Sequence, residues 1–228
     1  MFEGEVAHRL VERVRLSRWL GKLPPRLVWA SFVFVNGFLS VAVLAGLALV
    51  SHTPFVFPSV GPTAFMLYFT PLAPTASPRN TLCGHAIGIA CGYASLWMVG
   101  LEYAPSAILE ELHWRRVLAA ALSLAATGAV MVLLGVVHAP AAATALIVAL
   151  GIITTPTHLG IIELAVALLV LKALALNRLA GIDYPLWSKQ SSYFLAASVD
   201  PTEARDRPIG PAARQAPSES LPPGEETC

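Results

Sequence analysis

Two threonines that follow prolines and small residues are the polar side chains best placed to bind a ligand in this sequence. Gly61 and Thr63 flank one proline, and Pro140 precedes a run of small residues through Ala143 to Thr144. If each stretch opens a helix, its first turn presents free backbone N–H groups and about half a positive charge. Helix starts of this kind favour anions, and threonine hydroxyls add donors. We therefore expect an anion site where two helix starts converge, although prolines and small residues also suit simple packing.

Two histidines and one arginine extend this set of candidate residues. His138 precedes the second proline turn, where its ring would donate to an anion, change charge near neutral pH or satisfy turn carbonyls. His85 lies inside an apolar segment, and an ionisable group there faces the interior of a helix bundle, along a ligand path or in an interhelical bond. Arg79 follows a proline and would either attract anions or anchor the chain at a membrane surface.

Signatures of other chemistries are absent from the sequence. It contains no GxSxG, no HExxH and no glycine-rich phosphate loop with a lysine, so we do not expect an enzyme. The three cysteines and six histidines match no zinc spacing and no disulfide framework, so we expect neither a metal nor another cofactor. A net charge of +1 without a basic stripe argues against nucleic acid as a partner.

The composition indicates that these residues lie in a membrane. Of 228 residues, 56% are hydrophobic and only 13% are charged, whereas soluble domains carry about a quarter charged residues. Four apolar segments are long enough to span a bilayer, at residues 27–50, 82–101, 116–137 and 159–176. We therefore predict an all-α multi-pass membrane protein with four transmembrane helices.

Two shorter apolar segments between these spans are interrupted by prolines. In residues 51–81 six prolines restrict helix to about residues 62–69, and in the second segment we expect helix over about residues 141–153. Both are too short to span, and interrupted backbone at membrane depth must be buried in protein. Each half of the chain then has a long helix, a proline turn, a half-helix and a long helix. We predict two weakly similar repeats with re-entrant half-helices.

The ends of the chain are more polar than its centre. Residues 1–26 hold six Lys or Arg and form a basic segment with a short surface helix, while residues 188–228 form a polar tail that we expect to be largely disordered. With re-entrant half-helices, both tails share a face with Arg115 and Arg116, which the positive charges make cytoplasmic, in the plasma (inner) membrane. If the short segments instead cross fully, the repeat is inverted, Arg79 joins the tails and Arg115 and Arg116 lie opposite.

Four stretches together resemble the HPP family of integral membrane proteins. They are HAPAAATALIVALG from His138, FPSVGPTAFMLYFTPLAPTASPRN with its Pro-Arg-Asn ending, the Gly-His pair just after it, and NRLAGIDYPLW ending at Trp187. The resemblance covers about residues 25–187, close to the transmembrane domain that we place at 27–187. It implies four spanning helices and, for some members, nitrite transport. The family's His-Pro-Pro signature reads His-Ala-Pro here, with Ala139 in place of the middle proline.

These observations favour a transporter or channel for a small inorganic anion, with nitrite implied by the resemblance. The alternative is a membrane sensor or scaffold that does not transport and whose tails bind a partner. A polar cavity at the half-helix starts favours transport, whereas a filled centre favours a scaffold. Four spans leave little room to bury two re-entrant segments, so we also expect a homo-oligomer in the lipid bilayer.

Overall fold

Helices form all the regular secondary structure in residues 15–187, the part of the chain that the computed structural model describes. Four of them are long and apolar enough to cross a membrane: α3 (Pro25–Ser51), α5 (Pro78–Val99), α6 (Trp114–Leu134) and α8 (Pro156–Leu179). The predicted all-α class with four spanning helices is confirmed. The short helix α2 (Leu16–Leu20) precedes them, while residues 1–14 and the tail from 188 onward lie outside the described residues.

Two short apolar helices lie between the long ones, as predicted. Helix α4 (Val60–Phe69) and helix α7 (Pro140–Ala149) have 10 residues each, and each follows a non-helical segment. Ten residues of helix extend about 15 Å, which is half the hydrocarbon core of a bilayer. The 3-10 helix η1 (Pro74–Ala76) then links α4 to α5.

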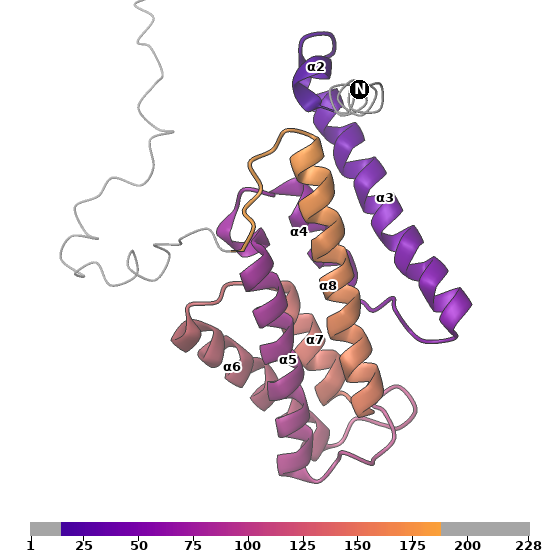
Figure 1. Cartoon of the computed structure of the whole chain (residues 1–228). Coiled ribbons are helices and arrows are strands. Elements are labelled where there is room, and N and C mark those ends of the chain that lie inside the picture. Colours follow the sequence, from indigo (N-terminus) through magenta and orange to yellow (C-terminus); the bar gives the residue numbers. More distant parts are fainter. Residues whose placement is uncertain (1–14, 188–228) are drawn as a thin grey trace, which may run out of the picture. The chain divides into compact units, whose positions relative to one another are not determined.

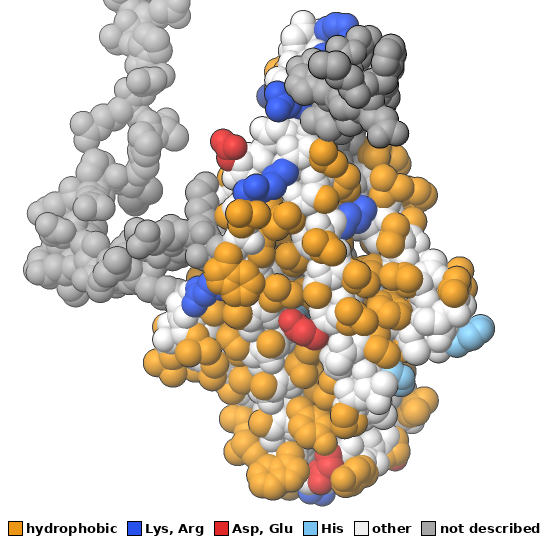
Figure 2. Space-filling model, viewed as in Figure 1, with side chains coloured by type: hydrophobic (Ala, Val, Ile, Leu, Met, Phe, Trp, Pro, Cys, Tyr) orange, Lys and Arg blue, Asp and Glu red, His pale blue; other side chains and the backbone are white. Residues whose placement is uncertain are grey.

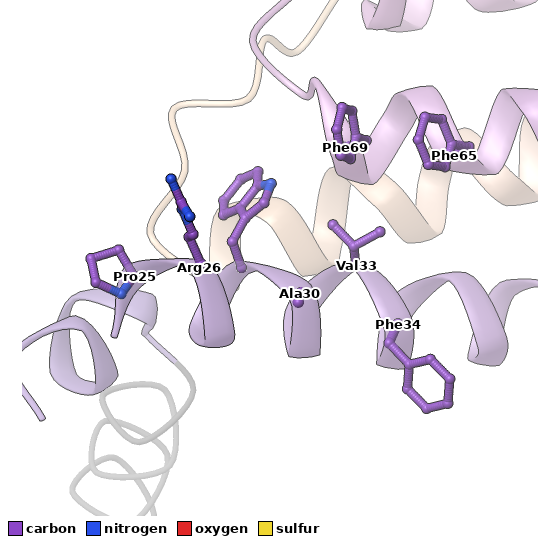
Figure 3. A pocket seen from close by; sticks show the side chains of 8 residues that line it. Pro25, Arg26, Ala30, Val33, Phe34, Phe65 and Phe69 are labelled. Carbon is purple, nitrogen blue, oxygen red and sulfur yellow. The ribbon is translucent and has the colours of Figure 1, made fainter. Parts of the chain in front are cut away.

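The end of α4 lies at the same end of the bundle as the start of α3. A groove of about 690 Å³ lies between the two helices. Figure 3 shows Phe69 opposite Val33, with Phe65 on the side away from Arg26. The Asn177 side chain, in the last turn of α8, donates to the Leu67 carbonyl over 3.0 Å. Helix α4 therefore runs antiparallel to α3 and ends beside the end of α8 (Figure 1).

The end of α7 lies at the opposite end of the bundle. The Arg116 side chain, in the first turn of α6, donates to the Ala149 carbonyl over 3.4 Å, and the Ala107 N–H donates to the Leu150 carbonyl over 2.9 Å. Arg79 binds the last carbonyls of α6 at the other end of that helix. Helix α7 therefore runs antiparallel to α6 and returns the chain to the end where α6 begins.

These contacts show that the chain traverses the bundle six times within the described residues. The non-helical residues 52–59 and 135–139 supply the length that α4 and α7 lack, so neither half-helix returns to the side from which it came. The re-entrant path that we expected is thus replaced by the alternative with full crossings. Helices α3, α4 and α5 and helices α6, α7 and α8 form two halves that begin at opposite ends of the bundle, which is the arrangement of an inverted repeat.

Large apolar side chains cover the outside of the bundle (Figure 2). Phe34 is 74% exposed, Leu49 77% and Leu133 82%, on two different long helices. So much exposed apolar surface on the spanning helices fits contact with lipid rather than with water. Most of the Lys and Arg side chains on the visible face lie toward the end that carries α2.

Three glycines on one face of α5 allow α7 to approach its backbone. A Cβ at Gly84 would lie 2.8 Å from the Cβ of His138, and one at Gly88 would lie 2.5 Å from the Ala141 oxygen. A Cβ at Gly92 would lie 2.8 Å from the Ala145 oxygen, one turn further along α7. Small residues four apart are typical of close helix contacts in membranes, and here they fix α7 relative to the histidine on α5.

Candidate functional site

Four of the eight predicted site residues meet inside the bundle, where the starts of α4 and α7 face each other. They are Thr63 from α4, His85 from α5, His138 just before α7 and Thr144 from α7, and each is at most 1% exposed. His85 connects the two half-helices, because its Nε2 lies 2.9 Å from Thr63 Oγ1 and its Nδ1 lies 2.7 Å from Thr144 Oγ1. We call these four residues the His–Thr cluster.

The second histidine joins the cluster from the link between α6 and α7. His138 Nδ1 lies 2.8 Å from the carbonyl oxygen of Thr75, in the 3-10 helix before α5. Its Nε2 lies 3.5 Å from Thr63 Oγ1, and its ring centroid lies 5.0 Å from that of His85. Both histidines therefore converge on the hydroxyl of Thr63.

The hydrogen-bond partners fix which ring nitrogens carry protons when both histidines are neutral. A carbonyl only accepts, so His138 carries its proton on Nδ1 and donates to Thr75. The Thr63 hydroxyl donates to the Ser59 carbonyl over 2.8 Å, so it accepts from His85 Nε2. The His85 Nδ1 is then unprotonated and accepts from Thr144.

The N-termini of the two half-helices supply partial positive charge at the His–Thr cluster without a fully charged side chain. Helices α4 and α7 point their N-termini at the cluster from opposite directions, and each N-terminus carries about half a positive charge. Ser59, the N-cap residue of α4, is fully buried, and its Oγ has no hydrogen-bond partner among the described residues. An arrangement of helix N-termini and hydroxyl donors suits a small anion.

The other four predicted site residues do not take part in these contacts. Gly61 is exposed with open space around it, and Ala143 is half-buried. Each lies on a different face of its helix from the threonine that we paired with it, because successive residues are about 100° apart. Pro140 is buried in the first turn of α7. Arg79 donates to the last two carbonyls at the end of α6, over 3.1 Å in both cases, and so fixes the start of the link that carries His138.

A lysine in α8 forms a second polar contact inside the bundle, which the sequence did not reveal. Lys172 Nζ donates to Ser40 Oγ over 2.8 Å and to the Asn36 carbonyl over 3.1 Å, both on α3. The same nitrogen lies 5.4 Å from the centre of the Tyr68 ring. Lys172 therefore ties α3 to α8.

The side chains of the His–Thr cluster contact one another between the half-helix starts and are at most 1% exposed. Three surface grooves of about 690, 630 and 560 Å³ lie along α2, α3, α4 and the segment after α8, and none of the three is lined by a residue of the cluster. A filled centre is the arrangement that we expected for a scaffold. However, the filling is polar, and polar groups buried in a membrane are costly compared with the apolar packing that a scaffold needs.

The fold and the cluster define a polytopic α-helical membrane protein whose two half-helices meet at a buried polar centre. The chain belongs to the HPP family, because the sequence model of the HPP transmembrane region matches residues 23–185. Comparison with curated proteins and with solved structures gives no significant match. The family expected from the sequence is therefore confirmed, with Ala139 in place of the middle proline of the signature.

Proposed function

We propose that this protein transports a small inorganic anion, with nitrite as the first candidate, and that it is not an enzyme. The observation that carries the proposal is the position of His85 between Thr63 and Thr144, at the point where two opposed half-helices begin. Burying ionisable side chains inside a membrane protein costs free energy, and such side chains usually have a function. Interrupted helices at corresponding places of two inverted halves are also typical of transporter binding sites.

The cluster offers an anion several donors at once. In the closed arrangement the Thr144 hydroxyl donates to His85, and the His85 Nε2–H donates to Thr63. An anion entering between the half-helices would accept hydrogen bonds from the same hydroxyl and ring nitrogen and from first-turn N–H groups. Each hydrogen bond to a charged group contributes about 1.5–3 kcal/mol, which offsets part of the lost hydration. Opposed movements of α4 and α7 would open the cluster toward one face or the other.

The distribution of positive charge supports an orientation with the tails in the cytoplasm. The end with α2 holds the basic residues Arg15, Arg18, Lys22, Arg26, Arg79 and Arg178, whereas Arg115 and Arg116 lie at the opposite end. An excess of Lys and Arg marks the cytoplasmic face. We propose the plasma (inner) membrane as the location and a homo-oligomer as the assembly, to be tested by the mass of the purified protein in detergent.

Anion uptake into proteoliposomes tests the proposed function. Purified protein is reconstituted, and the uptake of nitrite, nitrate, formate and chloride is compared with uptake by protein-free vesicles. We expect faster uptake of at least one of these anions, and loss of that uptake in His85→Leu, which removes both bridging nitrogens. If folded protein moves none of the four faster than protein-free vesicles do, the scaffold alternative replaces the proposal.

A further inference from the structure

The His138 ring has one nitrogen whose hydrogen bonding is incomplete when the ring is neutral. Its Nδ1–H donates to the Thr75 carbonyl, which leaves Nε2 with a lone pair and no proton. The nearest polar atom to this nitrogen among its described contacts is Thr63 Oγ1, at 3.5 Å. That distance is longer than an ordinary hydrogen bond, because the Thr63 hydroxyl hydrogen points to the Ser59 carbonyl and not to His138.

The hydroxyl of Thr63 has room for one more donor. A hydroxyl donates one hydrogen bond and accepts two. Thr63 Oγ1 donates to the Ser59 carbonyl over 2.8 Å and accepts from His85 Nε2 over 2.9 Å, which leaves one lone pair unused. A lone pair of Thr63 therefore faces the lone pair of His138 Nε2. A single proton on His138 Nε2 would complete the hydrogen bonding of both atoms.

The surroundings of His138 oppose this proton unless an anion is present. Among the described residues, the groups that contact the His138 side chain are Thr63 from α4, Thr75 from η1, and Gly84 and His85 from α5, and Ala141 of α7 lies beside Gly84. His85 is the titratable group in this set, and no carboxylate belongs to it. The fixed positive ends of α4 and α7 disfavour a cation between them. A bound anion would reverse this effect, because opposite charges close together stabilise each other.

We propose that His138 binds a proton at Nε2 together with the transported anion, so that the protein carries the two as a neutral pair. This inference rests on the proposed transport function and adds its coupling ion. The proton comes from water on the side where the anion enters, occupies Nε2 while the anion is bound, and leaves with the anion on the other side. The cluster returns to its neutral hydrogen-bonded form, and no net charge crosses the membrane.

The dependence of uptake on membrane potential tests the coupling in the unmodified protein. Proteoliposomes are clamped at 0 or 100 mV, inside positive, with potassium and valinomycin, and initial nitrite uptake is measured with and without an inward proton gradient of one pH unit. Uptake by protein-free vesicles is subtracted. For an uncoupled monovalent anion, 100 mV shifts the equilibrium accumulation about 50-fold. A neutral pair responds to the pH gradient, by up to tenfold in accumulation, and not to the potential.

A substitution at His138 identifies the proton carrier. His138→Asn places an amide N–H where Nδ1 lies, which keeps the donor to Thr75, but it has no group that takes up a proton. His138→Gln is a second variant in case the first is not stable. We expect the uptake that remains to follow the potential instead of the pH gradient. The matched control is Thr127→Val, which changes a buried α6 threonine whose hydroxyl donates to the Ser123 carbonyl of the same helix, and it should behave as the wild type does.

The possible results separate this inference from the proposed function. Wild-type uptake that follows the pH gradient, with loss of that dependence in the His138 variants, supports the proton–anion pair. Wild-type uptake that follows the potential overturns the coupling and leaves anion transport intact. A His138 variant that still follows the pH gradient overturns His138 as the carrier. No protein-dependent uptake of nitrite, nitrate, formate or chloride overturns both.

Discussion

Gly88 of α5 lies against the backbone carbonyl of Ala141 in α7, so closely that a Cβ on Gly88 would be 2.5 Å from that oxygen. This close approach fixes the position of α7 along the axis of α5. One turn away from the contact, each helix carries a residue of the cluster. His85 precedes Gly88 by three residues, and Thr144 follows Ala141 by three. The short bond between His85 and Thr144 thus depends on a glycine that is not itself polar.

A methyl group at Gly88 is expected to destabilise the protein. Forcing extra volume into a packed interface costs about 1–3 kcal/mol, which exceeds the helix propensity that alanine gains over glycine. The matched control is Gly128→Ala in α6, where a Cβ has open space. Thermal unfolding in detergent should show a lower melting temperature for Gly88→Ala than for Gly128→Ala. Equal melting temperatures would mean that α5 and α7 are not packed this closely.

The six-crossing path predicts which loops share a face of the membrane. Single cysteines are introduced at Ser17, Thr70 and Glu111 in a background without the native cysteines, and intact cells are treated with an impermeant thiol reagent. Ser17 and Thr70 lie at the end of the bundle that carries α2, so we expect both to be protected, while Glu111 at the other end is labelled. Protection of Glu111 together with Ser17, and labelling of Thr70, would restore the re-entrant path.

Restoring the family signature is expected to stabilise the protein slightly. Ala139 has φ −54° and is exposed, and a proline ring fixes φ near −65°. Ala139→Pro should therefore raise the free energy of unfolding by about 0.4–1 kcal/mol, chiefly by restricting the unfolded chain. Denaturation in detergent measures the difference. A loss of stability would show that the His-Ala-Pro turn differs from the geometry that a proline pair allows.

The polar half of the site was predictable because polar residues stand out in an apolar sequence. Thr63, His85, His138 and Thr144 were all identified from their positions beside prolines or inside spans, and all four meet in the structure. Gly61 was not distinguished from Thr63, since only the rotation of α4 against its neighbours decides which of the two faces inward. That rotation depends on contacts between segments far apart in the chain.

The path of the half-helices was not predictable from hydropathy. A ten-residue helix is too short to cross by itself, so its length favours a return to the same side. The crossing depends on the non-helical stretches before α4 and α7, whose direction only the tertiary structure sets. The glycine stripe on α5 was detectable in principle, because Gly84, Gly88 and Gly92 have the spacing of four that favours helix contacts.

The measurement that tests the central claim most directly is anion uptake by two threonine variants. Thr63→Val and Thr144→Val keep the shape of the side chain and remove the hydroxyl that contacts His85. The Thr144 hydroxyl would donate to the anion, and losing one hydrogen bond to a charged ligand weakens binding by about tenfold to over a hundredfold, so we predict a fall in uptake of that order at subsaturating anion for Thr144→Val. Thr63→Val removes the acceptor that orients the His85 Nε2–H, so we predict lower uptake for this variant as well. Thr127→Val, the buried control on α6, should retain wild-type uptake. Wild-type uptake by both Thr63→Val and Thr144→Val would contradict the anion site at the half-helix starts.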